Sequence, residues 1–109
     1  MIRLSRKLAL EALSRTGDGA GGFTGTWLPL GTHWGAVEPG RGRLERGEGG
    51  ARTRASYRIT IRAVPVGSPS RPEAGQRFLD GTRIYLIRAV TQSTDARYLT
   101  CYADEEAQS

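Results

Sequence analysis

The sequence predicts an all-β fold, a small barrel or rolled antiparallel sheet of roughly five to six strands with little helix. Three observations predict this class. A glycine-rich turn at residues 17–22 opens into an aromatic-bearing segment, residues 56–64 (SYRITIRAV) alternate apolar and polar side chains, and an Asp80-Gly81 pair separates two β-prone runs. At 109 residues the chain is expected to form a single domain spanning residues 1–109.

The first hairpin is predicted at the glycine-rich turn, residues 17–22. Glycine adopts positive φ without a Cβ penalty, and Asp18 can accept hydrogen bonds from its own turn backbone. The segment that follows carries Phe23, Trp27 and Trp34, the largest apolar side chains nearby. A small β domain needs such side chains to bury enough area, so we predict that all three anchor the core.

The segment before the turn, residues 2–13, fits two secondary structures. Its apolar positions alternate as in a strand at Leu8, Leu10 and Ala12, but they also fit a helical stripe that ends at Leu13. The residue types favour a helix. A strand after the turn needs a neighbour to fill its backbone hydrogen bonds, and we therefore predict a strand here.

The aromatic-bearing segment is interrupted by Pro29, which has no backbone N–H to donate to a ladder. We expect this strand to be bent, bulged or at a sheet edge near residues 28–31. It should resume over residues 33–38.

A flexible loop is predicted at residues 39–52, which are rich in glycine and arginine and almost free of apolar residues. Six arginines against two glutamates give residues 40–58 a local net charge of 6 − 2 = +4. Two interpretations remain open, a solvated connector and a loop that becomes ordered only on meeting a partner. The second makes five arginines candidates for channel or partner contact: Arg41, Arg43, Arg46, Arg52 and Arg54.

The clearest strand is residues 56–64. Its alternation places Ile59 and Ile61 on the same face as Tyr57 and Ala63, and we predict that the two isoleucines anchor the core. Three prolines then predict an irregular connection before the next strand.

The last third of the chain is predicted to contain three strands. Residues 76–79 and 82–91 form a hairpin around Asp80-Gly81, and the second arm is expected to be central because both of its faces are apolar. Residues 97–103 form a closing strand. An acidic tail, residues 104–109, should be solvated or should meet a basic surface.

The charge balance is +5, from 16 basic and 11 acidic residues, and it favours an acidic partner such as DNA or an acidic protein face. All the basic residues except Lys7 are arginine, a bias that a GC-rich genome would also produce. The single Cys101 cannot form an internal disulfide, and no apolar run reaches the roughly 18 residues of a membrane span. We expect a soluble protein made in a reducing cytosol, without a secretory signal.

No residue pattern predicts catalysis, a cofactor or a metal site. The GDGAGG string resembles a phosphate loop only superficially, because such loops lead into a helix and this one leads into a β-prone run. His33 is the only histidine, and Cys101 lies in an apolar strand where it is expected to be filler.

Taken together, these segments resemble the phage head-tail joining family, also called head closure or stopper proteins, and especially the versions carried by gene transfer agents. The resemblance covers nearly the whole chain. It depends on a set of spaced motifs: Asp18 with Gly21-Gly22 before a strand bearing Trp27, then Trp34 and Val37, a long variable loop, Ile61-Arg62, the strand GTRIYLIRAV at 81–90, and a closing strand with Cys101 and acids. Pro29 and the Gly35-Ala36 pair after Trp34 depart from the family pattern.

The resemblance implies a compact β-barrel-like protein that forms a homo-oligomeric ring, a hexamer, between the portal or adaptor protein and the tail terminator or tail tube protein. The implied location is the head-tail interface of a virion or phage-like particle, beside packaged double-stranded DNA and away from membranes. The implied role is structural: the ring retains the DNA and docks the tail, with no catalytic site. The alternative is a stand-alone nucleic-acid-binding barrel that uses the arginine-rich loop.

Overall fold

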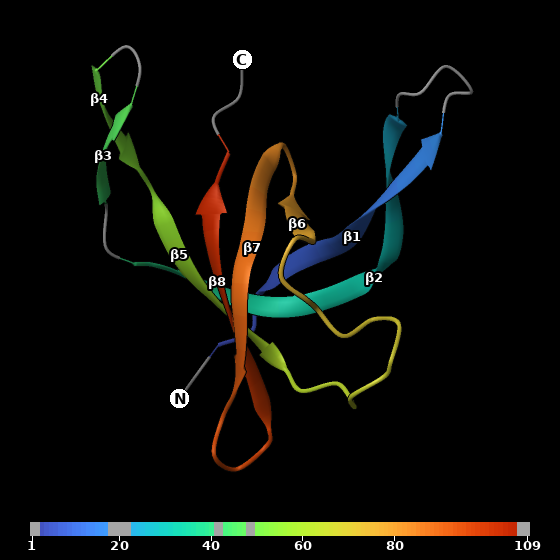
Figure 1. Cartoon of the computed structure of the whole chain (residues 1–109). Coiled ribbons are helices and arrows are strands. Elements are labelled where there is room, and N and C mark those ends of the chain that lie inside the picture. The colour runs from blue at the N-terminus through green and yellow to red at the C-terminus, as the bar shows by residue number, and fades with distance from the viewer. Residues whose placement is uncertain (1–2, 18–22, 41–42, 48–49, 107–109) are drawn as a thin grey trace.

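The computed structural model describes residues 3–17, 23–40, 43–47 and 50–106, and at strand residues 16–17, 23–24, 43–47 and 50–54 it describes the backbone alone. Within these residues the chain forms strands and no helix, so no described helix could span a membrane (Figure 1). The strands are β1 (Arg6–Gly17), β2 (Phe23–Pro39), β3 (Arg43–Gly47), β4 (Gly50–Arg54), β5 (Ser56–Arg62), β6 (Arg77–Asp80), β7 (Arg83–Gln92) and β8 (Tyr98–Glu105).

Six of the strands form one antiparallel sheet that rolls up and closes on itself in the order β1-β2-β5-β8-β7-β6. The ring closes where β6 pairs with β1 over the short register Ala9↔Leu79 to Glu11↔Arg77. Closure leaves these six strands with neighbours on both sides over part of their length, which satisfies their backbone groups. The predicted all-β rolled sheet is confirmed.

The core lies inside this ring and draws fully buried side chains from five strands, while β2 adds the partly buried Leu30 and Val37. Strand alternation sends every second residue inward, and the largest inward side chains come from β6 and β7. The fully or almost fully buried apolar residues are Leu8, Leu10, Ile59, Ile61, Phe78, Tyr85, Ile87, Leu99, Cys101 and Ala103. The two isoleucines singled out from the sequence are thus completely buried.

The N-terminal segment is a strand, as predicted, because β2 supplies the neighbour that its backbone needs. β1 and β2 pair along their lengths, from Arg6↔Gly35 to Gly17↔Phe23. The predicted turn at 18–22 lies outside the described residues. The final pair nevertheless shows that the chain reverses between Gly17 and Phe23, so the hairpin is confirmed.

A bulge interrupts β2 where proline was expected to disturb it. Leu10 is paired with Gly31 and Glu11 with Pro29, so Leu30 has no opposite residue on β1. Proline has no N–H to donate to the ladder, and the extra residue beside it shifts the register so that pairing continues on both sides. The prediction of an irregularity near residues 28–31 is confirmed.

Trp34 is not a core residue, and this prediction is wrong. It is 56% exposed, whereas its neighbour Gly35 is buried. A Cβ on Gly35 would lie 2.8 Å from Leu8 Cδ1 and 3.1 Å from Ile61 Cγ2, so this position faces the filled interior. Because adjacent strand residues point to opposite faces, an inward Gly35 directs Trp34 outward.

Of the other two predicted aromatic anchors, only Trp27 has a described side chain, and it is not among the fully buried core residues. Trp27 is half-buried, and the guanidinium carbon of Arg77 lies 4.1 Å from the centroid of its ring. Arg77 is also 2.8 Å from Glu11 through an ion pair, so the tryptophan is covered by a paired cation. The side chain of Phe23 is outside the described part.

The segment predicted as a loop at residues 39–52 contains regular structure, which corrects that prediction. β2 continues to Pro39, and β3 and β4 form a separate two-stranded sheet from Arg43↔Arg54 to Gly47↔Gly50. Backbone pairing between the two strands needs no apolar side chains, so the low apolar content did not reveal it.

Two hairpins therefore extend beyond the closed ring. Past Glu11, β1 and β2 pair only with each other among the described strands; we call residues 12–17 and 23–28 the β1–β2 arm. The β3–β4 hairpin, residues 43–47 and 50–54, is the second extension. Both rise from the same end of the ring, on either side of the C-terminal end of β8 (Figure 1).

The remaining hairpin is confirmed with a one-residue shift of its turn. Asp80 pairs with Arg83, which leaves Gly81 and Thr82 as the turn residues, and Gly81 has φ of 62°. A positive φ at the first of two turn residues suits a tight hairpin and favours glycine. β7 lies between β6 and β8, as its apolar faces predicted.

The irregular connection between β5 and β6 is also confirmed. It folds back on itself through turns, one of which is closed by the hydrogen bond from Ser68 N to Pro65 O at 3.0 Å.

At the C-terminus, the prediction of an acidic tail over residues 104–109 is partly wrong. Asp104 and Glu105 belong to β8, because each has a strand partner and a basic residue to meet.

Candidate functional site

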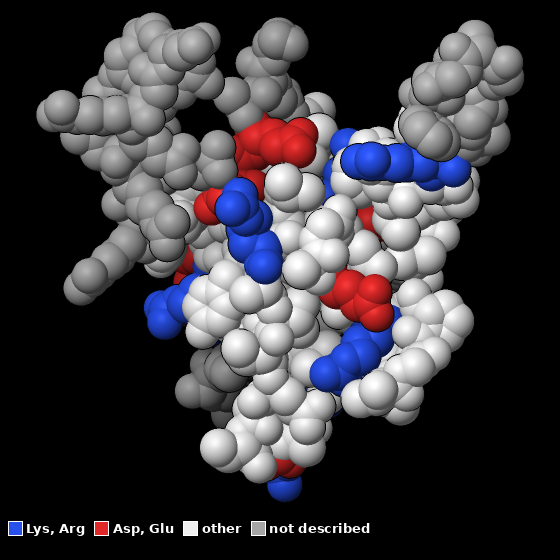
Figure 2. Space-filling view, in the orientation of Figure 1, with Lys and Arg blue, Asp and Glu red and all other residues white. Residues whose placement is uncertain are grey.

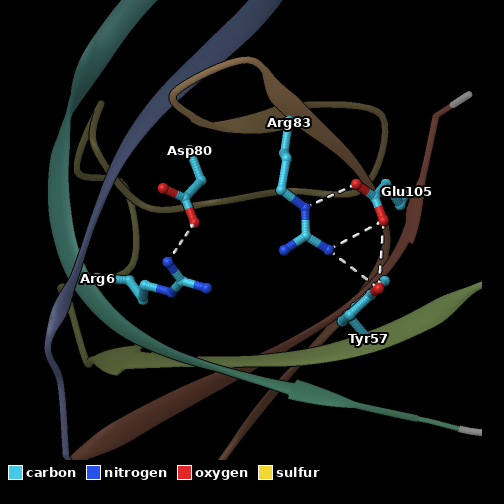
Figure 3. Close-up of polar contacts among 5 residues, drawn as sticks. All are labelled: Arg6, Tyr57, Asp80, Arg83 and Glu105. Atoms are coloured by element: carbon cyan, nitrogen blue, oxygen red, sulfur yellow. Dashed lines mark hydrogen bonds and ion pairs between the residues drawn. The ribbon is translucent and has the colours of Figure 1, made fainter. Parts of the chain in front are cut away.

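A cluster of paired charges lies inside one end of the ring, where β5, β7 and β8 come together (Figure 3). Arg83 binds Glu105 with two hydrogen bonds, Nε–Oε2 at 2.8 Å and Nη2–Oε1 at 3.0 Å. Its Nη2 also donates to the hydroxyl of Tyr57 at 3.0 Å, and that hydroxyl donates to Glu105 Oε1 at 3.2 Å. These bonds join three strands.

The pairing shifts the ionisation of both partners toward their charged forms. The hydrogen bond from Arg83 holds the pKa of Glu105 below its ordinary value, and the bond to Glu105 raises the pKa of Arg83. The guanidinium also lies 5.4 Å from the ring centroid of Tyr57 and 5.3 Å from that of Tyr85. Both members of the pair therefore stay ionised across the neutral range.

A second, looser pair lies opposite within the same ring (Figure 3). Arg6 Nη1 is 3.6 Å from Asp80 Oδ2, and this oxygen is buried without a hydrogen-bond partner among the described residues. The hydroxyl of Tyr85 is likewise buried and unbonded in the described part, and burial raises the pKa of this phenol.

The same end of the ring holds the base of the β3–β4 hairpin. Gly40 N donates to Ser56 O at 2.7 Å, and Glu105 N donates to Ala55 O at 3.1 Å. The hydroxyl of Ser56 donates to Asp104 at 3.2 Å, and Arg88 pairs with the same carboxylate at 3.2 Å. The residues on both sides of the hairpin are thus tied to the ring.

This arrangement suits mechanical support better than acid-base chemistry. A general acid and base need carboxylates or histidines whose pKa values are pushed apart and toward neutrality. Here the pKa of Glu105 is lowered and that of Arg83 is raised, so both are shifted away from neutral pH. We name Tyr57, Arg83 and Glu105 the clamp, because they join the ends of three strands at the base of the hairpin.

The clamp was not among the residues chosen from the sequence. One signal for it existed: in the alternation of β7, Arg83 falls on the same face as Tyr85 and Ile87, which are inward. A charge on an inward face requires a partner. The sequence alone could not say that Glu105 supplies it, because the pair joins strands whose contact depends on closure of the sheet.

Cys101 and His33, the two residues considered for chemistry from the sequence, are both held in packed surroundings. Burial raises the pKa of the Cys101 thiol to about 12, which suppresses the nucleophilic thiolate. His33 Nε2 is 2.7 Å from the carbonyl oxygen of Ser70, and its ring meets Phe78 edge to face. No group of three or more metal-ligating side chains occurs in the part of the chain that the structure describes.

The arginines predicted to contact a partner lie on or beside the β3–β4 hairpin. Arg43 and Arg46 are on β3, while Arg52 and Arg54 are on β4. The register pairs Arg43 with Arg54 and Glu45 with Arg52 along the ribbon. Arg41 lies outside the described residues.

Outside the hairpin, the described charges do not form a basic face in the view of Figure 2, where basic and acidic residues are interspersed among uncharged ones. The described surface instead exposes several large apolar residues. Those on strands are Leu13, Leu28, Trp34 and Tyr102, with Val66 in the connection after β5. Among these, the aromatic residues Trp34 and Tyr102 are of the types that are enriched where proteins meet one another.

Comparison with known proteins shows which family this chain resembles. The family model for phage head completion proteins matches residues 1–106. A chain of the solved virion of a native gene transfer agent particle has a TM-score of 0.84 and 39% sequence identity, and the match covers 100% of both chains. A search of curated proteins found no match.

The family match extends over every described strand, and the similar structure is matched over its whole length, so the likeness is not confined to one motif. Both agree with the resemblance noted from the spaced motifs of the sequence. The chain therefore belongs to the phage head completion protein family, as a structural head-completing component of a virion or phage-like particle.

Proposed function

We propose that copies of this chain form a ring of about six subunits between the portal or adaptor protein and the tail, where the ring retains packaged DNA and docks the tail. The observation that carries the proposal is the full-length likeness to a chain of a gene transfer agent virion. The match covers the whole of both chains at 39% identity and is not limited to one segment, so the same kind of position in a particle is expected.

The fold suits this position. A closed sheet with a buried core resists deformation, and the clamp adds bonds between β5, β7 and β8 at one end. That end bears both hairpins, with Leu13 and Leu28 exposed on the β1–β2 arm, while Trp34 of β2 and Tyr102 of β8 are exposed outside the hairpins. A connector needs such separate surfaces, because it must meet its own copies, the head and the tail.

We further propose that the role is purely structural, without catalysis or a cofactor. The residues with nucleophilic or acid-base potential support this: Cys101 is buried with a raised pKa, and the carboxylate of Glu105 is held by Arg83. Neither comparison points to the alternative of a stand-alone nucleic-acid-binding barrel.

The test is removal of the chain from the particle-producing cell, followed by complementation. We expect particles without it to have heads that lack tails and lose DNA, as counted by electron microscopy and by nuclease-protected DNA. Supply of the wild-type chain should restore both. Normal tailed, DNA-filled particles in its absence would contradict the proposal, and salt-sensitive DNA binding by the free chain would favour the alternative.

A further inference from the structure

We propose that the β1–β2 arm is the subunit contact of the assembled ring, with the β2 edge of one copy pairing with the β1 edge of the next. The proposal deepens the ring inferred above and rests on it. Its basis is the backbone of the arm, which leaves two strand edges open.

Both edges are long enough to form a ladder. Register pairs from Ala12↔Leu28 to Gly17↔Phe23 bond β1 to β2 within the arm, while β6 reaches only as far as Glu11 and β5 begins to pair only at Gly35. Among the described residues, neither outer edge of the arm has a strand neighbour. Open edges of this kind are the usual template for pairing with another chain.

The edges also have few of the devices by which proteins normally guard them, and the β2 edge has neither charges nor prolines. Residues 23–28 (FTGTWL) contain no charged residue and no proline, and residues 12–17 contain one charge, Arg15. Pro29 and the bulge at Leu30 lie at the base of the arm, where they do not block the edge beyond. An unguarded β-prone edge is a liability unless it is covered in the assembled state.

Apolar side chains on the arm add to this argument. Leu13 is 39% exposed and Leu28 is 47% exposed. Ala12 pairs with Leu28 and Leu13 pairs with Trp27, so the two leucines lie on opposite faces of the ribbon. A neighbouring arm placed edge to edge would cover part of both faces at once, whereas a partner stacked on one face would cover only one leucine.

The occupant is a second copy, because the two open edges of the arm match each other. They lie on opposite sides of one ribbon and have the same length. When two arms point the same way, β2 of one copy runs antiparallel to β1 of the next, which is the orientation of the pairing within the arm. Such a head-to-tail contact uses two different surfaces and closes into a ring when the rotation allows.

The test uses disulfide formation between copies in assembled particles. Ser14 and Thr26 are paired within one chain and so lie on one face, which makes Ser14→Cys and Thr26→Cys suitable single substitutions. Each chain then has one thiol outside the buried core, since Cys101 is buried while residue 14 is half-buried and residue 26 is exposed. Particles are assembled from an equal mixture of the two variants and treated with diamide as the oxidant. In a second mixture, Leu28→Cys replaces Thr26→Cys, which allows for a shift of two residues in the register between copies.

We expect mixed particles to yield a crosslinked dimer with one chain of each kind, and particles made from a single variant to yield about tenfold less. Absence of the mixed dimer for both pairings, in particles that contain the chain as a ring, would overturn the inference and leave the proposed function standing. A crosslink from the arm to a different particle protein would likewise overturn the inference and leave the proposed function standing. Particles that assemble without the chain would overturn both.

A substitution provides a second, independent test. Thr26→Lys places a charge on the β2 edge, and we expect about a tenfold loss of incorporation into particles with an unchanged melting temperature of the free chain, because the arm lies outside the closed ring. Thr91→Lys, at an exposed position of β7, is the matched control and should incorporate normally. Equal incorporation of the two variants would overturn the inference.

Discussion

At the scale of single residues, the pair of Arg83 and Glu105 makes stability depend on pH. The pKa of Glu105 is lowered by folding, so its stabilising effect is complete above its ordinary value of 4.5 and is lost as pH falls through the lower folded value. We expect Glu105→Gln to lower the free energy of unfolding by about 1 kcal/mol at pH 7, since both partners are partly exposed.

Urea unfolding at several pH values is the measurement. The difference in the free energy of unfolding between wild type and Glu105→Gln should decrease as the pH falls below about 4.5. Glu73→Gln, an exposed change in the connection before β6, should leave the free energy nearly unchanged throughout. A gap of constant size at every pH would show that the amide disturbs packing and that the charge is unimportant.

A second residue-scale prediction concerns Cys101. Because its thiol is fully buried and its pKa is raised to about 12, thiol reagents should label it only after unfolding. Cys101→Ala should cost about 1 to 3 kcal/mol through the lost contacts, and particle assembly should be unaffected. Labelling kinetics, denaturant unfolding and particle counts measure these effects. Loss of DNA transfer by a normally folded variant would contradict the prediction.

At the scale of the element, two of the three glycines of β2, Gly35 and Gly25, have opposite surroundings. A Cβ at Gly35 would lie 2.8 Å from Leu8 Cδ1 and 3.1 Å from the backbone oxygen of Thr60, which cannot move away. We expect Gly35→Ala to lower the free energy of unfolding by about 1 to 3 kcal/mol. Gly25→Ala is the control, because its new Cβ meets only the partly exposed side chain of Leu13, at 3.0 Å. Equal effects in thermal unfolding would refute the role assigned to Gly35.

The β3–β4 hairpin is the second element with a specific prediction. Changing Arg41, Arg43 and Arg46 together to Ser should leave the melting temperature of the free chain almost unchanged, because the hairpin lies outside the closed ring and charges on such extensions contribute little to stability. Particles built with this variant should lose DNA or lack tails, because positive charge repeated around a ring would face DNA or an acidic adaptor surface. Normal particles would mean that the charge reflects composition alone.

At the scale of the whole molecule, the closed sheet and buried core imply that a single copy folds without a partner. We expect the purified chain to be mainly monomeric at micromolar concentration and to assemble on a template in the particle. Light scattering after gel filtration measures the mass. A stable hexamer in isolation would show instead that the ring forms before docking.

The sequence by itself determined the all-β class, the places along the chain of the six strands that form the closed sheet, and most of their turns. Short-range signals suffice for these features: glycine and Asp-Gly turns, the alternation in residues 56–64, and the missing donor of Pro29 each act within a few residues. The family resemblance was also present in the spacing of these same signals.

Only the tertiary structure decided which large side chains are buried and which charges meet. Trp34 is exposed because Gly35 must face a filled interior, and Glu105 meets Arg83 because the sheet closes so that β7 and β8 are neighbours. The open edges of the β1–β2 arm follow from the same closure, because β6 and β5 pair only with the parts of β1 and β2 that lie in the ring. Alternation along a strand distinguishes two faces, but it is the rolling of the sheet that makes one of them the inside.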